Sequence, residues 1–228
     1  RKLGGNENHI QGIGHGDLIE TPYGETFMVC LGFRIQSDWM PFHHLGREVF
    51  LVPVTWDKNG WFTAGVDGTV QTVMDQPLKA SEQKINGRYD VSFETIKNEP
   101  QRFCHLREYH PECYEFTENS VTLLGNRFTL NDTESPTFLG VRQSEFDTEL
   151  TVSLTGNSPE AGITFYLSEE HHYDLAVLCK EKKRTLILRL RIGDAVMTAK
   201  EIELPEDAQI ILKVVSDAAQ YHFYGFIN

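Results

Sequence analysis

The sequence predicts an all-β protein built from antiparallel strands, and three observations support this prediction. Short runs rich in β-branched and aromatic residues recur along the chain, separated at regular intervals by turn signals containing Gly, Asn, Asp and Pro. Asn59-Gly60 lies between two such runs and is the strongest short signal for a β-hairpin. No segment has the apolar period of a helix of three or more turns. This pattern indicates a sandwich or a barrel.

The first strands are organised around two turns. Residues 17–21 and 26–31 are expected as strands joined by TPYGE, whose Pro and Gly suit a turn. Residues 49–56 form a β-branched run that ends at DKNG, and residues 61–64 return antiparallel to it. From about residue 71 to residue 98 polar residues increase and no period is visible, which is typical of a linker or a long surface connection.

Beyond this segment the strands resume and become longer. We expect them at residues 120–124, 137–141, 145–154, 161–167, 173–179, 185–192, 195–204, 209–215 and 220–227. Their separators, such as TGNSPE, SEEHH and PEDA, are turn sequences. The chain is therefore expected to contain a first β region at 1–75, a linker at 76–98 and a β-sandwich at 99–228.

The charge balance argues against a nucleic-acid partner. Lys and Arg total 21 against 33 Asp and Glu, a formal net charge of −12, and the basic residues cluster only around 180–184. Neutral ligands such as sugars suit this surface better. The apolar runs are too short to cross a bilayer, and residues 1–10 lack the features of a secretory signal, so we expect a cytoplasmic protein without membrane contact.

The four cysteines do not have the spacing of a zinc site. None forms a CxxC pair. Cys30 and Cys179 lie inside apolar strand patterns and are expected as buried free thiols. A disulfide between Cys104 and Cys113 stays open at this point.

GIGHG, at residues 12–16, invites comparison with a phosphate-binding loop. Such a loop needs a strand before it and a helix after it, and here nothing strand-like precedes while DLIETP continues as a strand. Glycines on both sides of His15 instead suggest a backbone that passes close to a neighbour and presents the imidazole from a tight corner. The alternative is a histidine bonded to a nearby carbonyl in a β-turn.

Two histidine pairs and the scattered carboxylates give no clear catalytic pattern. Adjacent residues of a strand point to opposite faces, so His43-His44 and His171-His172 are expected at the surface or in loops and not on one metal ion. Glu169-Glu170-His171-His172 has the residue types of a metal cluster, but it sits between two expected strands and is expected as a turn. No Asp or Glu has an obvious apolar pocket that would raise its pKa.

Two longer strings resemble a known family. GHGDLIETPYGETFMVCLGFR and HHLGREVFLVPVTWDKNGW resemble the last propeller blade of family-43 glycoside hydrolases, the group of β-xylosidases and α-L-arabinofuranosidases. FCHLREYHPECYEFTENSVTLLG, TFLGVRQSEFDTELTVSL and AGITFYLSEEHHYDLAV resemble the start of the family's C-terminal sandwich. The resemblance implies the terminal blade of a five-bladed β-propeller followed by a concanavalin-like antiparallel β-sandwich.

The resemblance also implies an activity and a division of labour. The family hydrolyses xylosides or arabinofuranosides with inversion, which requires an acid and a base about 6.5 to 9.5 Å apart. In the family the catalytic carboxylates precede the GH-D motif, so none is expected in this chain, and other polypeptide is expected to supply the first four blades. This chain alone is expected to be inactive on xylo- and arabino-oligosaccharides.

The family's non-catalytic site residues map onto three positions. His15 matches a histidine near the propeller centre that holds a calcium ion or an ordered water. Arg34 matches an arginine that reaches the sugar hydroxyls, for which a guanidinium fork is well suited. A sandwich loop caps the pocket in the family; here the segment from Arg142 to Phe146 is expected to do so, with Phe146 as its aromatic ring.

The sandwich itself allows further hypotheses. In the family it continues beyond YHFYGF, so either the sandwich is truncated or another segment completes it. An unpaired strand edge would favour association, and a homo-oligomer is expected. A non-catalytic carbohydrate-binding module would need exposed rings on one sheet face, and alternate rings of the late strands should be buried. Those rings are Phe165, Tyr166, Tyr173, Tyr221, Phe223 and Tyr224. A purely structural domain is the third hypothesis.

Overall fold

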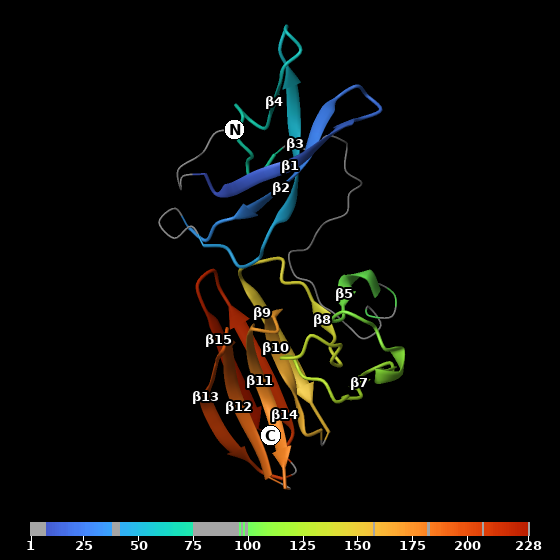
Figure 1. Ribbon diagram of the computed structural model, residues 1–228, viewed down its shortest axis with the longest axis vertical. Helices are drawn as coiled ribbons and strands as arrows, with labels where there is room; N and C mark the ends of the chain where they lie inside the picture. Colours follow the sequence, from blue (N-terminus) through green and yellow to red (C-terminus); the bar gives the residue numbers. More distant parts are fainter. Residues whose placement is uncertain are drawn as a thin grey trace. The chain divides into compact units, whose positions relative to one another are not determined.

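Two compact units make up the chain in the computed structural model (Figure 1). The structure describes residues 8–37, 42–74, 96, 98, 100–156, 158–181, 183–206 and 208–227. Unit 1 is Arg1–Gly87 and unit 2 is Arg88–Asn228. The predicted linker 76–98 lies outside the described residues apart from Ile96 and Asn98, so its extent stays a prediction.

Unit 1 contains a four-stranded antiparallel sheet whose strands are neighbours in sequence order. The strands are β1 (Ile10–Glu20), β2 (Thr26–Arg34), β3 (Glu48–Trp56) and β4 (Phe62–Ala64). A four-stranded antiparallel sheet is the form of one propeller blade. Cys30 and Val52 lie on one face of the sheet and Phe27 lies on the other, and all three are almost completely buried. Burial raises the pKa of the Cys30 thiol, as expected for an inert core cysteine.

The hairpin predicted at Asn59-Gly60 is confirmed and joins β3 to β4. The Asp57 carboxylate accepts hydrogen bonds from the backbone N–H groups of Asn59 and Trp61 at 2.8 and 2.9 Å. Gly60 takes the positive φ of 80° that closes the loop. A local carboxylate cap and one left-handed glycine therefore fix this turn.

The first strand begins earlier than the sequence suggested, and the expectation that nothing strand-like precedes GIGHG was wrong. β1 starts at Ile10 and runs through the motif with register shifts on both sides of Gly14. Gly12 has φ +64°, and a Cβ placed there would lie 2.4 Å from a ring carbon of Phe33. Bulges break the period-two alternation by which a strand is recognised, which is why the start was missed.

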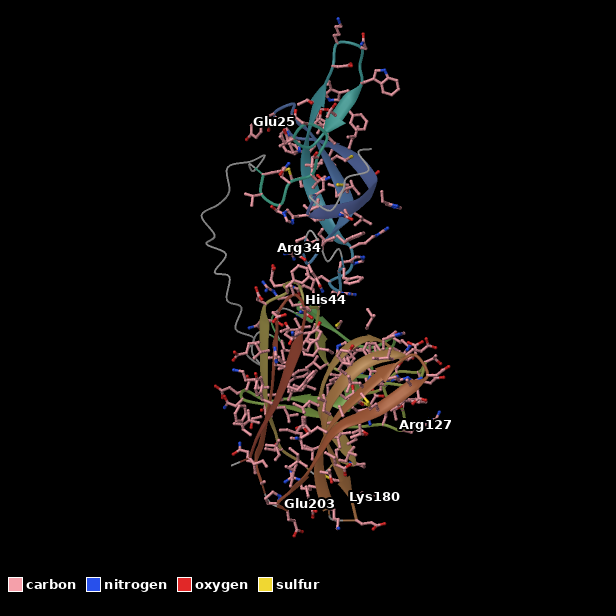
Figure 2. The ribbon with its side chains drawn as sticks, turned by 90° about the vertical axis from the view of Figure 1, so that its left-hand side faces the viewer. Glu25, Arg34, His44, Arg127, Lys180 and Glu203 are labelled. Carbon is pink, nitrogen blue, oxygen red and sulfur yellow. The ribbon has the colours of Figure 1, made fainter. Side chains whose placement is uncertain are left out.

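Unit 2 is a β-sandwich with small accessory ladders. Its larger sheet has the order β10-β11-β12-β13 and its smaller one β15-β14-β9, while β5-β8 and β6-β7 form two-stranded ladders. The strands are β5 (Phe103–Cys104), β6 (Tyr114–Phe116), β7 (Val121–Leu123), β8 (Gly140–Val141), β9 (Thr148–Leu154), β10 (Glu160–Ser168), β11 (His171–Lys180), β12 (Lys183–Ile192), β13 (Ala195–Leu204), β14 (Ile210–Ser216) and β15 (Tyr221–Ile227). Within unit 2, Figure 2 shows the two large sheets as separate layers.

The core of unit 2 lies between the two sheets. Ile210, Leu212 and Val214 alternate along β14 and are 0 to 1% exposed. They pack against inward residues of the other sheet, among them Leu175 and Leu186. Burying each such side chain contributes about 1.5 to 3 kcal/mol of hydrophobic stabilisation, which makes this alternation the main determinant of strand register.

The helical content is as expected from the sequence, whereas Cys179, which was expected to be buried, is only partly buried. Among the described residues the helical pieces longer than one residue are the 3₁₀ turns Pro100–Arg102 and Pro111–Cys113. The four cysteines are free thiols, so Cys104 and Cys113 are not bonded to each other. In the described part of the chain, no helix is long and apolar enough to span a membrane.

Both sheets of unit 2 end in open edges. Among the described residues β13 pairs only with β12, and β15 pairs only with β14. Val196, Met197 and Ile202 of β13 are exposed. An unpaired edge with apolar side chains is a site of association unless it is covered.

Candidate functional site

His15 lies in the irregular stretch of β1 between Gly14 and Asp17. Its backbone has φ +56°, which is uncommon for a residue with a side chain, and the residue is exposed. The structure therefore places it in a strand bulge and not in a β-turn. Because of the bulge, the His15 imidazole does not follow the alternating side-chain directions of a regular strand, and it projects from a constrained backbone.

Arg34 ends β2 and forms a two-pronged ion pair with Glu48, the first residue of β3. Its Nε lies 2.9 Å from Glu48 Oε1, and its Nη2 donates to Oε2 at 2.9 Å. Both side chains are about a quarter exposed, which limits solvent screening of the pair. Glu48 was not foreseen from the sequence. The available signal was its place in LGRE, on a strand expected to run antiparallel to the one that ends at Arg34.

A histidine pair lies near the same strand ends. The His43 ring stacks on Phe33 with centroids 3.8 Å apart, and His44 Nδ1 lies 3.4 Å from Gln36 Nε2. Burial, followed by the charge of His43, lowers the pKa of His44. Figure 2 shows His44 and Arg34 at the same end of the unit 1 sheet. Both histidines lie in the segment between β2 and β3, as expected, and the two imidazoles have different neighbours.

His15 and Arg34 are not brought into contact by the ladder. Ile10 pairs with Arg34, whereas Gly14 pairs with Leu31, so His15 lies further along the sheet. At about 3.3 Å per residue, Gly14 is three residues or roughly 10 Å from Arg34 along the strand direction, and His15 lies further away. The ladder therefore does not place the two residues opposite each other.

Phe146 belongs to the segment between β8 and β9 of unit 2. The residue is half-buried, and its carbonyl accepts a 2.7 Å hydrogen bond from Ser216 Oγ. The Tyr221 hydroxyl donates to Gln143 Oε1 at 2.8 Å, which fixes the start of the same loop. Arg142 is exposed. The loop is thus anchored to the smaller sheet, while its capping role stays a prediction.

His15 and the other described residues do not by themselves form a calcium site. Calcium takes six to eight oxygen ligands, and His15 offers a nitrogen. The described residues contain no cluster of three or more His, Cys, Asp or Glu side chains that could hold an ion. The calcium ion expected at His15 stays a prediction, and no step below depends on it.

A buried polar network in the larger sheet of unit 2 was missed by sequence reasoning. The expectation that His172 lies at the surface is wrong, because its side chain is 0% exposed. Its Nδ1 lies 2.9 Å from Asp174 Oδ1, which also accepts from Thr164 Oγ1 at 2.7 Å. Arg189 Nε donates to Asp174 Oδ2 at 2.9 Å and its guanidinium also pairs with Glu160. The network is a structural element of the sheet.

Of the four residues expected as a turn, Glu169 and Glu170 form the turn between β10 and β11, whereas His171 and His172 begin β11. The sequence signal that could have located the network is the alternation of His172 and Asp174 within an apolar strand, opposite two arginines of the next strand. Buried charged groups require such partners.

Comparison with known proteins gives a consistent result. Residues 91–228 match the Beta xylosidase C-terminal Concanavalin A-like domain, and residues 2–62 match Glycosyl hydrolases family 43. The chain is 31% identical to the non-reducing end alpha-L-arabinofuranosidase of Bacteroides ovatus, across 95% of this chain and 42% of that protein. It is 26% identical to a xylosidase/arabinosidase of Butyrivibrio fibrisolvens, across 96% of this chain and 43% of that protein.

A solved structure agrees with these matches. The Bacteroides ovatus xyloglucan PUL GH43B structure superposes with a TM-score of 0.83 and 29% identity, covering 97% of this chain and 46% of that chain. The chain thus spans less than half the length of the relatives it matches. The resemblance to family 43 and the propeller-blade-plus-sandwich fold class are confirmed. Because the match at residues 91–228 extends over more than half of this chain, the chain belongs to the family of β-xylosidase C-terminal concanavalin A-like domains.

Proposed function

We propose that this chain is the C-terminal part of a glycosidase that hydrolyses xylosides or arabinofuranosides. The observation that supports the proposal is the succession, along one chain, of a family-43 segment at 2–62 and the β-xylosidase C-terminal domain at 91–228. The names of the relatives, an arabinofuranosidase and a xylosidase/arabinosidase, fall in the same substrate class.

In the proposal the catalytic carboxylates belong to polypeptide outside this chain. An inverting enzyme needs a protonated carboxylic acid and a carboxylate base on opposite sides of the scissile bond. The two described carboxyl groups with a clear pKa shift are Asp132 and Asp217, and in both backbone hydrogen bonds lower the pKa. Both are turn residues bonded to their own loops, which is unlike a general acid whose pKa must be raised.

Arg34 and Glu48 carry the sugar-binding part of the proposal. Glu48 accepts from Nε and Nη2 and thereby fixes the plane of the guanidinium. The proposal directs the guanidinium toward sugar hydroxyls, where a preoriented donor loses little side-chain entropy on binding. His15, further along the sheet, would contact another part of the same sugar. Glu48 is then a positioning residue.

The sandwich has a supporting role in this account. The loop that carries Phe146 is tied to the smaller sheet through Ser216 and Tyr221, so its backbone is preorganised. In the proposal Phe146 covers the bound sugar and the rest of the domain supports the propeller. Association into a homo-oligomer and a cytoplasmic location remain further predictions.

The test uses the full-length protein that contains this chain, with p-nitrophenyl β-xyloside and p-nitrophenyl α-L-arabinofuranoside as substrates. We expect hydrolysis of at least one of them, and proton NMR at early times should show the product with inverted anomeric configuration. A product formed with retained configuration, or hydrolysis of neither glycoside, would refute the proposal.

A further inference from the structure

The outer face of the smaller sheet in unit 2 carries a pair of exposed rings. Ile210, Leu212 and Val214 of β14 point into the core, so the alternate residues Ile211, Lys213 and Val215 lie on the outer face. In the ladder Lys213 pairs with Tyr224 and Ile211 pairs with Phe226. Cross-strand partners share a face, so Tyr224 and Phe226 are outer residues of β15.

The two rings are positioned as a pair. Tyr224 is 45% and Phe226 is 48% exposed. Their centroids are 6.5 Å apart and their planes differ by 16°. Exposing large apolar side chains to water is unfavourable, so adjacent exposed rings mark a binding site more often than single scattered ones do.

Hydrogen-bonding groups lie beside the rings in the same rows of the sheet. Thr151 of β9 and Lys213 of β14 share the row of Tyr224. Ser153 of β9 lies in the row of Phe226 and accepts a 3.1 Å hydrogen bond from Gln209. The surface thus combines two apolar rings with donors and acceptors one or two strands, about 5 to 10 Å, away.

Charges at the centre of this face argue against an apolar protein partner. Lys213 Nζ lies 2.8 Å from Glu149 Oε1, and this pair bridges β14 and β9 beside the rings of β15. Packing a second sheet on the face would remove both charges from water, which costs several kcal/mol per ion before their attraction is counted. The net charge of −12 likewise disfavours an anionic ligand.

We propose that this face, with Tyr224 and Phe226 as its stacking rings, binds a neutral glycan chain. A pyranose presents an apolar C–H face, which fits an exposed ring, and a rim of hydroxyls, which fits Lys213, Thr151 and Ser153. The site is separate from the sugar contact proposed for Arg34 and would hold polysaccharide without cleaving it. It needs only this chain, so its test does not depend on the proposed hydrolytic activity.

The experiment is affinity electrophoresis of the 228-residue chain in gels containing arabinoxylan, xyloglucan or dextran. We expect retardation by arabinoxylan or xyloglucan, and titration with xylohexaose should give the affinity in solution. Tyr224→Ala or Phe226→Ala alone should weaken binding about tenfold, and the double variant should migrate as in a gel without glycan. Tyr224→Phe should retain binding, because it keeps the ring.

Tyr23→Ala is the matched control. Tyr23 is 79% exposed in a turn of unit 1, and its removal should leave retardation unchanged. Circular dichroism and thermal unfolding of each variant establish that the fold is retained. An unretarded native chain in all three gels would overturn the proposal, and so would unchanged retardation of the double variant. A concentration-dependent dimer that the double variant abolishes would also overturn it, by assigning the face to a second copy.

Discussion

Arg34 is held by Glu48 through two hydrogen bonds, which fix the orientation of its guanidinium, and the proposed role of Arg34 is to contact the sugar. Arg34→Ala in the full-length enzyme should lower kcat/KM about 100-fold or more, because a charge-assisted contact to the sugar is lost. Glu48→Gln should raise KM more than it lowers kcat, since the guanidinium keeps its chemistry but loses its fixed plane. Steady-state kinetics on the nitrophenyl glycosides measure both effects.

The outcome that contradicts this assignment is an unchanged kcat/KM for Arg34→Ala. Arg47→Ala provides the comparison, because Arg47 directly precedes Glu48 and is exposed. If Arg47→Ala lowers kcat/KM and Arg34→Ala does not, the sugar contact belongs to Arg47, and the pair of Arg34 with Glu48 is structural.

Asp174 is the centre of the buried network of unit 2, and its side chain is 3% exposed. Asp174→Ala should lower the free energy of unfolding of unit 2 by about 3 to 5 kcal/mol, because His172 and Arg189 lose their shared carboxylate. Glu160→Ala is the control: Glu160 is 42% exposed on the same arginine, so its loss should cost at most about 1 kcal/mol. Urea unfolding measures both, and equal effects would show that the network is not the stabilising feature.

At the scale of elements, the bulged strand β1 depends on Gly12. Gly12→Ala adds a methyl group to a residue with φ +64° and directs it at Phe33, so we expect unit 1 to lose about 1 to 3 kcal/mol. Gly14→Ala is the matched control, since a Cβ there meets nothing within 4 Å. Thermal unfolding of the two variants should separate them by several degrees. Equal stability would contradict the proposed role of the close approach.

The sequence predicted elements best where alternation and turn chemistry agree. The strands from 161 to 227 and the hairpin at Asn59-Gly60 were located within a few residues. The start of β1 was missed because bulges interrupt its alternation, and β5 and β6 were missed because such short strands leave no period. The segment expected at 137–141 is a strand only at Gly140–Val141.

Site prediction was less complete, for a physical reason. Residue type and motif pointed to Arg34, but the partner Glu48 comes from another strand and depends on register, which the sequence leaves open. His172 looked like a surface residue because its neighbours Glu169, Glu170 and His171 are polar. Its burial results from packing against segments that are distant in sequence, which a local sequence pattern does not reveal.

At the scale of the whole molecule, the chain combines parts of two domains. Family-43 similarity covers residues 2–62 and the C-terminal domain covers residues 91–228, while the relatives are more than twice as long as the matched region. Arg34 and His15 would then be walls of a sugar pocket whose acid and base come from other polypeptide. The acidic surface suits a neutral glycan substrate.

The most direct test of this account compares hydrolysis of p-nitrophenyl β-xyloside and p-nitrophenyl α-L-arabinofuranoside by residues 1–228 and by the full-length protein under identical conditions. The account predicts activity of the full-length protein and no turnover above the uncatalysed rate by residues 1–228. Turnover by residues 1–228 at a rate comparable with that of the full-length protein would contradict it, because the catalytic carboxylates would then lie within this chain.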